Sequence, residues 1–176
     1  MKATGVIRRI DDLGRIVIPK EIRKNLRIKN GENLEVFVDE NENIILRKYN
    51  QLDKLKDLSE ELSFSINSIT KKTVLITNTE EVISSSGINK KDYNNKPLSE
   101  KVLNIISTRK QIFSPELTRI NITDDEEEVS YIITPIIANG DLIGSIIILS
   151  KDTPLTKNDE QISKIVASFL QAHIEG

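Results

Sequence analysis

The sequence predicts an α+β protein of two domains joined by a helix. Three observations predict it: a basic N-terminal stretch of short strands, a stretch of heptad-spaced apolar residues, and a C-terminal part in which runs of strands and helices are segregated. Such segregation is typical of a sheet covered by helices, and 176 residues fit one or two domains. We therefore expect a domain at 1–50, a connecting helix at 51–70 and a second domain at 71–176.

The N-terminal domain begins with two segments of strand character. Residues 3–10 interleave apolar side chains with arginines, and residues 15–18 are a short β-branched run. Between them Asp12, Leu13 and Gly14 predict a turn, because Gly14 accepts a positive φ that other residues resist.

A short basic helix is predicted to follow. Pro19 is suited to the first position of a helix, and the helix should run to about Leu26. At 100° per residue the cations of this segment fall within an arc of about 100°, with no acid among them. They are Lys20, Arg23, Lys24 and Arg27.

Residues 34–38 and 44–48 predict two more strands around a polar turn at 39–43. Four short strands and one short helix bury too little to be stable alone, and such small domains usually need a metal, disulfides or a partner chain. The residue types exclude disulfides and thiolate or multi-histidine metal sites, so we expect an obligate dimer with intertwined strands.

The connecting helix is predicted from Leu55, Leu62 and Ile69, which recur every seven residues. Two interpretations remain open. The helix either pairs with that of a second copy as a short coiled coil, or packs against its own C-terminal domain.

The C-terminal domain is predicted from strand runs, turn signals and one helix start signal. Asn139-Gly140-Asp141 is a strong hairpin signal because Asn and Gly accept positive φ, and Thr156 with Asp159 resembles a capping box. The acidic run at 124–128 is interpreted as an exposed loop rather than a cation site. The expected elements are strands at 73–77, 82–85, 129–138 and 142–149, and helices opening at 97–99 and 156–159.

Charge and residue types narrow the function. Residues 1–29 hold nine Lys and Arg against three acids, whereas residues 51–176 hold 14 against 19. This asymmetry indicates a polyanion-binding head, unless the cations only solvate an exposed face.

The chain has no Cys, a single His and no Gly-rich phosphate loop. We expect no catalytic residues, no metal and no cofactor, and, without a signal peptide or spanning segment, a cytoplasmic protein.

Residues 5–49 read GVIRRIDDLGRIVIPKEIRKNLRIKNGENLEVFVDENENIILRKY. This stretch closely resembles the AbrB family of bacterial transition-state regulators. With a C-terminal domain of this length, the resemblance implies a swapped-hairpin β-barrel dimer followed by a GAF-like regulatory domain, in a regulator of sporulation-stage transcription. The family's DNA-contacting arginines map onto Arg8, Arg15 and Arg23. Lys24 stands where a second Arg is frequent, which keeps the charge and loses the bidentate fork. Weaker candidates are Lys2, Arg9, Lys20 and Arg27.

GAF-like domains often enclose a small ligand between the sheet and its loops. The rim predicted here is Ser84, Ser85, Ser86 and Tyr93, although serines beside a glycine also make plain turns.

The expected partners are double-stranded DNA, a second copy of the chain as a homodimer or homotetramer, and an unidentified small-molecule effector. The alternatives are an antitoxin-like module that binds a protein, since the same N-terminal fold heads many toxin antidotes, and a ligand sensor that modulates DNA affinity.

Overall fold

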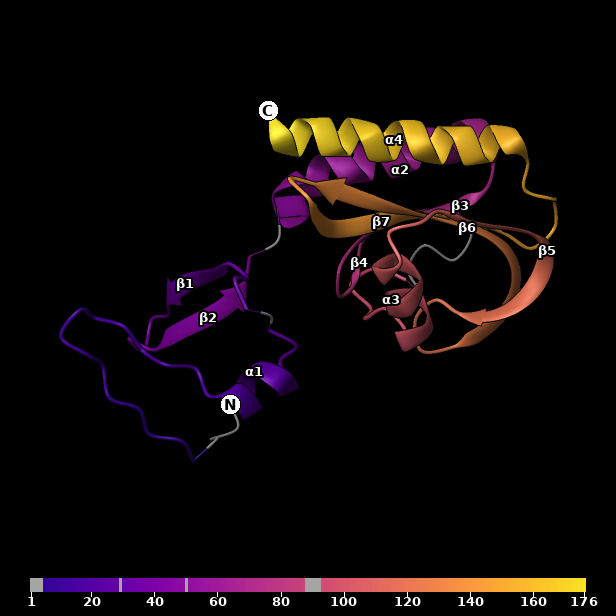
Figure 1. Cartoon of the computed structure of the whole chain (residues 1–176). Coiled ribbons are helices and arrows are strands. Elements are labelled where there is room, and N and C mark those ends of the chain that lie inside the picture. The colour runs from indigo at the N-terminus through magenta and orange to yellow at the C-terminus, as the bar shows by residue number, and fades with distance from the viewer. Residues whose placement is uncertain (1–4, 29, 50, 88–92) are drawn as a thin grey trace. The chain divides into compact units, whose positions relative to one another are not determined.

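The computed structural model describes residues 5–28, 30–49, 51–87 and 93–176. The chain divides into two compact units, Met1–Tyr49 and Asn50–Gly176, which are coloured in chain order in Figure 1. The connecting helix therefore belongs to the second unit. None of the helices in the described ranges is long and apolar enough to span a membrane.

The first unit contains one short helix and one hairpin. Helix α1 (Lys20–Asn25) follows Pro19, which adopts an extended conformation as the N-cap residue. Strands β1 (Leu34–Val38) and β2 (Ile44–Lys48) pair antiparallel in the expected register, with Val38 opposite Ile44.

The prediction of strands at 3–10 and 15–18 is wrong for the described residues of a single chain. Residues 5–10 and 15–18 are irregular arms on either side of a loop, and the loop is closed by the Asp11 N–H donating to the Arg15 carbonyl at 3.1 Å. A strand needs a ladder of hydrogen bonds to a neighbour. Within this chain β1 and β2 pair with each other, so the arms have no ladder partner among the described residues.

The described residues of the first unit form no buried core. None of its described residues is buried, and Ile7 is 92% exposed. Removing apolar area from water is the main favourable term in folding, so a unit whose described side chains are at most half-buried gains little from that term. Its exposed large apolar residues are Val6, Ile7, Ile10, Leu13, Ile16, Val17, Leu26, Val36, Phe37, Val38, Ile44, Ile45 and Leu46.

The second unit is a five-stranded antiparallel sheet covered on both faces. The strand order is β4-β3-β7-β6-β5. Figure 1 shows α2 and α4 along one face and α3 on the other. The elements are η1 (Gln51–Leu55), α2 (Lys56–Thr70), β3 (Thr73–Asn78), β4 (Val82–Ser86), α3 (Glu100–Ser107), β5 (Ile112–Asn121), β6 (Glu126–Ala138), β7 (Asp141–Ser150) and α4 (Lys157–Glu175).

Alternation along the strands gives the second unit two cores. In β7, Ile146 and Ile148 belong to the cluster under α2 and α4, whereas Ile147 and Leu149 belong to the cluster under α3. This is the period of two that a sheet buried on both faces requires.

Helix α2 packs against its own domain. Leu55 of η1 and Leu58 and Leu62 of α2 lie against the core beneath it, and Ile66 is part of that core. The heptad position Ile69 points outward and is 76% exposed. The interpretation of α2 as a helix that packs on its own sheet therefore accounts for its apolar stripe except at its C-terminal end.

The local start and turn signals of the second unit were predicted correctly. Ser99 caps α3 by accepting from the Val102 N–H, and Thr156 forms a capping box with Asp159. Asn139 and Gly140 have φ values of 51° and 80° in the β6–β7 turn.

Two parts of the second unit were not predicted. Strand β5 was missed because Pro115 and five polar residues interrupt its apolar pattern. The acidic run is a loop only in part, since β6 starts at Glu126. The cause is tertiary: Glu126, Glu127 and Glu128 pair with β5 in the ladder.

Candidate nucleic-acid interface

The loop from Asp11 to Arg15 is fixed by one carboxylate. Oδ1 of Asp11 accepts from the backbone N–H groups of Leu13 at 3.0 Å and Arg15 at 2.8 Å. Oδ2 accepts from Nε of Arg15 at 2.7 Å. The Gly14 N–H donates to the Asp11 carbonyl at 2.9 Å, and Gly14 takes the positive φ of 74° that closes the turn. The loop thus presents Arg15 in a defined position.

Electrostatics at this loop follow from the same contacts. Hydrogen bonds from the backbone and side chain of Arg15, with a smaller contribution from the Leu13 backbone, hold the pKa of Asp11 below its usual value of 3.8. The Arg15 side chain nevertheless stays 72% exposed. Nε thus contacts Asp11 while most of the Arg15 side chain stays accessible to solvent.

The basic helix differs from the sequence prediction at one position. Lys20 and Lys24 are exposed on α1 as expected, but the helix ends at Asn25. Arg27 has a left-handed φ of 54° and follows the helix. The projection that placed Arg27 on the same arc therefore does not apply, because it assumed continuous helical geometry.

Arg23 is the least accessible of the predicted arginines. It is half-buried, and its Nη1 donates to Oδ1 of Asn30, seven residues along the chain. Its Nε is buried without a partner among the described residues. Arg23 therefore tethers α1 to the segment before β1.

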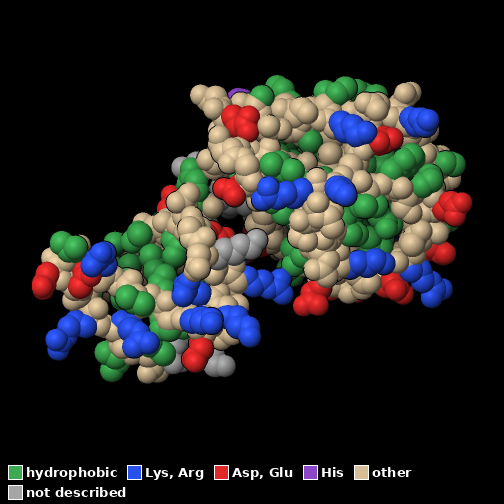
Figure 2. Space-filling view, in the orientation of Figure 1, with side chains coloured by type: hydrophobic (Ala, Val, Ile, Leu, Met, Phe, Trp, Pro, Cys, Tyr) green, Lys and Arg blue, Asp and Glu red, His purple; other side chains and the backbone are tan. Residues whose placement is uncertain are grey.

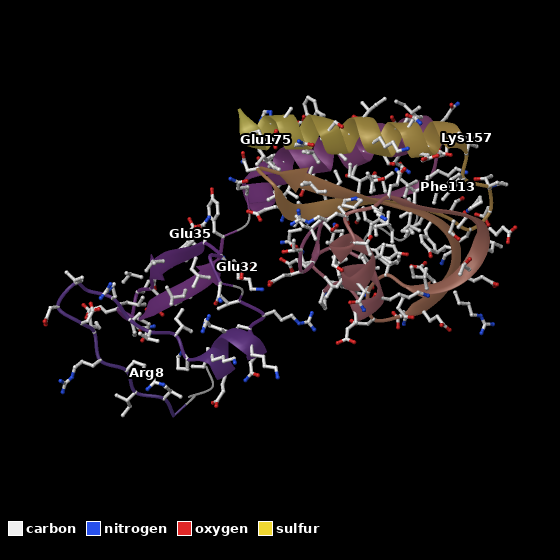
Figure 3. The ribbon with its side chains drawn as sticks, viewed as in Figure 1. Arg8, Glu32, Glu35, Phe113, Lys157 and Glu175 are labelled. Atoms are coloured by element: carbon white, nitrogen blue, oxygen red, sulfur yellow. The ribbon has the colours of Figure 1, made fainter. Side chains whose placement is uncertain are left out.

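The remaining predicted cations lie on the first arm. Arg8 and Arg9 are exposed, and Figure 3 labels Arg8 on this arm. Lys2 lies outside the described residues. On the visible face of the first unit, Lys and Arg side chains gather over α1 and the arms (Figure 2). The structure thus brings loop, arm and helix cations onto one small unit.

Sequence reasoning missed a second loop with the same geometry. Oδ1 of Asp39 accepts from the N–H groups of Asn41 and Asn43, and Oδ2 accepts from the Asn43 side-chain amide at 2.9 Å. These hydrogen bonds lower the pKa of Asp39, the Asn43 side chain being the largest cause. The shared signal was an Asp four residues before a side-chain donor, Arg15 in one loop and Asn43 in the other.

Arg47 on β2 was also missed. Its guanidinium carbon lies 5.1 Å from the centroid of the Phe37 ring on β1, a cation–π contact across the hairpin. The register puts Glu35 directly opposite Arg47, which is a common sequence signal for paired strands. Arg47 therefore adds an ordered cation to the first unit.

Of the predicted ligand rim in the second unit, the cavity described below is lined by Tyr93 and not by Ser84, Ser85 or Ser86. The side chains of Ser84 and Ser86 are buried, and the Ser84 hydroxyl lies 2.7 Å from that of Ser63 on α2, under the helices. Ser85 donates to Oδ1 of Asn94 at 2.7 Å. Strand alternation sends Ser84 and Ser86 to the face opposite Tyr93, and Ser85 is not part of the cavity wall that contains Tyr93.

Tyr93 does line a cavity of about 230 Å³. Its hydroxyl donates to both carboxylate oxygens of Glu127, at 2.7 and 2.8 Å, and Nζ of Lys151 lies 3.4 Å from Glu127. The wall residues Tyr93, Val129 and Leu149 belong to the core cluster on the α3 side of the sheet. Within the described ranges, no cluster of acidic or histidine side chains is suited to hold a metal ion.

Two family models match the chain. Residues 54–175 match the model described as stage V sporulation protein T C-terminal, transcription factor. Residues 7–54 match the model of the antidote-toxin recognition protein MazE, a bacterial antitoxin. The boundary between the two matches lies at η1, close to the boundary between the two units.

The second unit has the fold of GAF domains. The chain is similar to the cofactor-binding GAF domain of the nutrient sensor CodY from Clostridium difficile, with a TM-score of 0.51 and 11% identity over 70% of this chain and 93% of that one. It is also similar to the GAF domain of an Acinetobacter phosphoenolpyruvate-protein phosphotransferase, with a TM-score of 0.56 and 12% identity over 68% and 81%. At these identities the likeness shows the fold alone.

Relatives of known name match at higher identity. Transition state regulatory protein AbrB of Bacillus subtilis (strain 168) is 53% identical over 49 residues, which are 28% of this chain and 50% of that protein. Stage V sporulation protein T of the same organism is 40% identical over 177 residues, 99% of both chains. The predicted fold class is confirmed. The chain belongs to the stage V sporulation protein T family of transcription regulators, with an AbrB-like N-terminal domain and a GAF-like C-terminal domain.

Proposed function

We propose that the protein is a cytoplasmic, non-enzymatic regulator of sporulation-stage transcription that binds double-stranded DNA through a homodimer of its N-terminal units. The observation that carries the proposal is a cationic surface on a unit in which no described residue is buried. The similarity to transcription regulators over the whole length supports the class of function.

The cations suit a phosphate backbone and base edges. Arg15 is held by its backbone and by Nε, so its two terminal nitrogens keep a fixed fork that matches a phosphate or a guanine edge. Lys20 and Lys24 are exposed point charges on α1. Each phosphate that they neutralise releases counterions, so the affinity falls steeply with salt.

Dimerisation follows from the exposed apolar residues of the first unit. The arms at 5–10 and 15–18 expose Ile7, Ile10 and Val17, and β1 and β2 expose Val36 and Val38. Pairing the arms of one chain with the other chain supplies the missing ladder and buries these side chains, as a swapped hairpin does. The two-fold axis then places two copies of the basic surface at a fixed spacing, which suits pseudo-symmetric DNA.

A homotetramer would use the helices of the second unit. Phe64 and Ile69 on α2, and Ile165 and Phe169 on α4, are exposed apolar side chains of the two helices that cover one face of the sheet. A second copy of this face buries them in a helical interface. Solution mass of the intact protein, measured with and without DNA, distinguishes dimer from tetramer.

The direct test is a gel-shift titration with promoter DNA at about 50 and 200 mM salt. We expect binding at the lower concentration and a loss of affinity of tenfold or more at the higher one, since several phosphates are contacted at once. A control uses a single-stranded oligonucleotide of the same sequence. Failure of the intact protein to bind duplex DNA at low salt would refute the proposal.

A second candidate is a ligand sensor whose C-terminal unit modulates DNA affinity, favoured by the cavity beside Tyr93. The segment Lys71–Thr73, which lines this cavity, directly follows α2. The other end of α2 leads through η1 to the first unit, so a ligand that moves this segment acts on the helix that joins the two units. A ligand-dependent change in DNA affinity would support this candidate.

A third candidate is an antitoxin-like module, favoured by the match of residues 7–54 to the MazE model. The N-terminal unit would then cap a toxin, with the second unit as an appendage. Residues 50–176, however, form a folded unit with two cores. Co-purification of a small toxin at one-to-one stoichiometry would favour this candidate over DNA binding.

A further inference from the structure

The cavity in the second unit has charged side chains around an apolar wall. Val129, Leu149 and the ring of Tyr93 are buried side chains that form part of the wall. The charged lining residues are Lys71, Lys72, Lys151, Glu127 and Asp152. The lining residues thus carry three positive and two negative charges, an excess of one positive charge.

The buried ammonium of Lys72 is the central observation. Lys72 is 8% exposed, and Nζ donates to the carbonyls of Thr153 at 3.0 Å and Pro154 at 3.1 Å and to the Thr153 hydroxyl. All of these acceptors are neutral, and no carboxylate of the described residues pairs with Lys72. Buried charges are usually paired with an opposite charge, so Lys72 leaves a positive charge uncompensated at the cavity wall.

The carboxylate of Glu127, by contrast, is already satisfied. It accepts from Tyr93 and lies 3.4 Å from Lys151, and its side chain is 14% exposed. Asp152 is exposed to solvent, where water screens its charge. The balance of the site therefore favours a negative group over a positive one.

The size of the cavity limits the occupant. About 230 Å³ corresponds to roughly eight water molecules at the volume each occupies in the liquid. An inorganic ion leaves the apolar wall uncovered, whereas a nucleotide exceeds this volume. A small organic acid puts its carbon chain against Val129 and Leu149 and its negative group near the ammonium groups.

We propose that the cavity lined by Lys71, Lys72, Tyr93 and Lys151 is a binding site for a small organic carboxylate with an apolar chain. The proposal rests on the sensor candidate above, and it names the class of effector and the residues that select it. Lys71 and Lys151 are exposed and contact the carboxylate directly. The ammonium group of Lys72 already donates three hydrogen bonds, so it attracts the carboxylate through its charge and not through a direct hydrogen bond.

The test is calorimetric titration of the full-length protein with hexanoate, a straight-chain carboxylate of about the cavity's size. Hexanamide has the same shape without the charge, and we expect it to bind at least about tenfold more weakly because it lacks attraction to the ammonium groups. Inorganic phosphate, which has no apolar chain, is expected to bind similarly weakly. Equal binding of hexanoate and hexanamide, or of hexanoate and phosphate, would overturn the proposal.

Variants locate the site. Replacing two exposed ammonium groups in the double variant Lys71→Gln, Lys151→Gln should weaken hexanoate binding by about tenfold or more. Asp152→Asn removes a repelling charge and should tighten it severalfold. The matched control is Lys164→Gln, which breaks an exposed ion pair with Glu160 on α4, away from the cavity.

The calorimetric results can be judged separately from the proposed DNA binding. No detectable hexanoate binding, or unchanged binding by the double variant with an unaltered thermal midpoint, would overturn the site. Gel shifts of the same preparations report DNA binding independently. Loss of the carboxylate site with intact gel shifts refutes only this inference, and loss of the gel shift with intact calorimetry refutes only DNA binding.

Discussion

At the level of single residues, Arg15 joins a fixed backbone to an exposed guanidinium. Its N–H and Nε both donate to Asp11, while 72% of the side chain stays accessible. An exposed ion pair of this kind contributes little to stability, so its geometry serves positioning. Arg23 differs, because it is half-buried and bonded to Asn30. We therefore expect substitution of Arg15 to affect mainly DNA binding, and substitution of Arg23 to affect folding as well.

Arg15→Ala should weaken DNA binding by about tenfold or more, the usual effect of removing a bidentate base or phosphate contact. The thermal midpoint should change little, because the backbone hydrogen bonds to Asp11 remain. Gel shifts and thermal melts of the same preparation measure both effects, with Lys164→Ala as the control. A large loss of thermal stability with Arg15→Ala would make Arg15 a structural residue instead.

The carboxylate of Asp11 makes the stability of its loop depend on pH. Its pKa is lowered in the folded state by the hydrogen bonds from Arg15 and Leu13. The stabilisation is thus fully present above the usual pKa of about 3.8, and it is lost as the pH falls through the lower folded value. Asp11→Asn keeps an acceptor oxygen and removes the charge, so unfolding in urea should depend less on pH between pH 5 and strong acid.

The control for this measurement is Asp12→Asn, which makes the same change in net charge at the adjacent residue. Urea midpoints at the two ends of the pH range give the comparison. An equal reduction in acid sensitivity for both variants would show that net charge, and not the Asp11 contacts, is responsible.

At the level of elements, the two loops of the first unit are copies of one design. In each, an Asp closes the loop with backbone hydrogen bonds and its carboxylate, and the fourth residue has a positive φ. That residue is Gly14 with φ of 74° in one loop and Glu42 with φ of 61° in the other. The left-handed conformation suits glycine and costs a residue with a Cβ about 1–2 kcal/mol.

The same geometry therefore predicts opposite effects for two substitutions. Gly14→Ala should destabilise the protein by about 1 kcal/mol, and Glu42→Gly should stabilise it by several tenths of a kcal/mol, after the entropy cost of glycine. Urea unfolding of the full-length protein at one fixed protein concentration measures both. If both variants shift stability in the same direction, the shared loop geometry is not the cause.

At the level of the whole molecule, the two units differ in what holds them together. The second unit buries two apolar clusters, one on each face of its sheet. The first has no buried residue in its described part. Stability of the second unit is thus intramolecular, whereas the proposed homodimer makes that of the first depend on association.

Unfolding of the first unit should therefore depend on protein concentration. We expect the thermal midpoint of residues 1–49 alone to fall on dilution, while that of residues 50–176 stays constant, because mass action affects only an associated state. Circular dichroism melts over a hundredfold range of concentration, with sedimentation to report mass, provide the measurement. A concentration-independent midpoint for residues 1–49 would argue against an obligate dimer.

The sequence by itself determined the class of fold, the order of most elements and the family. Local rules were sufficient to predict the helix caps at Ser99 and Thr156 and the turn at Asn139-Gly140, because capping and turn chemistry act over three or four residues. The motif of residues 5–49 was sufficient for the AbrB-like domain, because its spacing is specific.

Only the tertiary structure decided which side chains meet. The cavity brings Tyr93, Glu127 and Lys151 together from three separate parts of the chain, whereas the sequence analysis had expected Ser84, Ser85 and Ser86 beside Tyr93. Likewise the end of α1 at Asn25 removed Arg27 from the helical arc, and Asn30 engaged Arg23. The cavity depends on contacts between residues distant in sequence, whose free energies no local pattern contains. The Arg23 contact spans only seven residues, but it depends on the turn that follows α1, which the helical pattern does not specify.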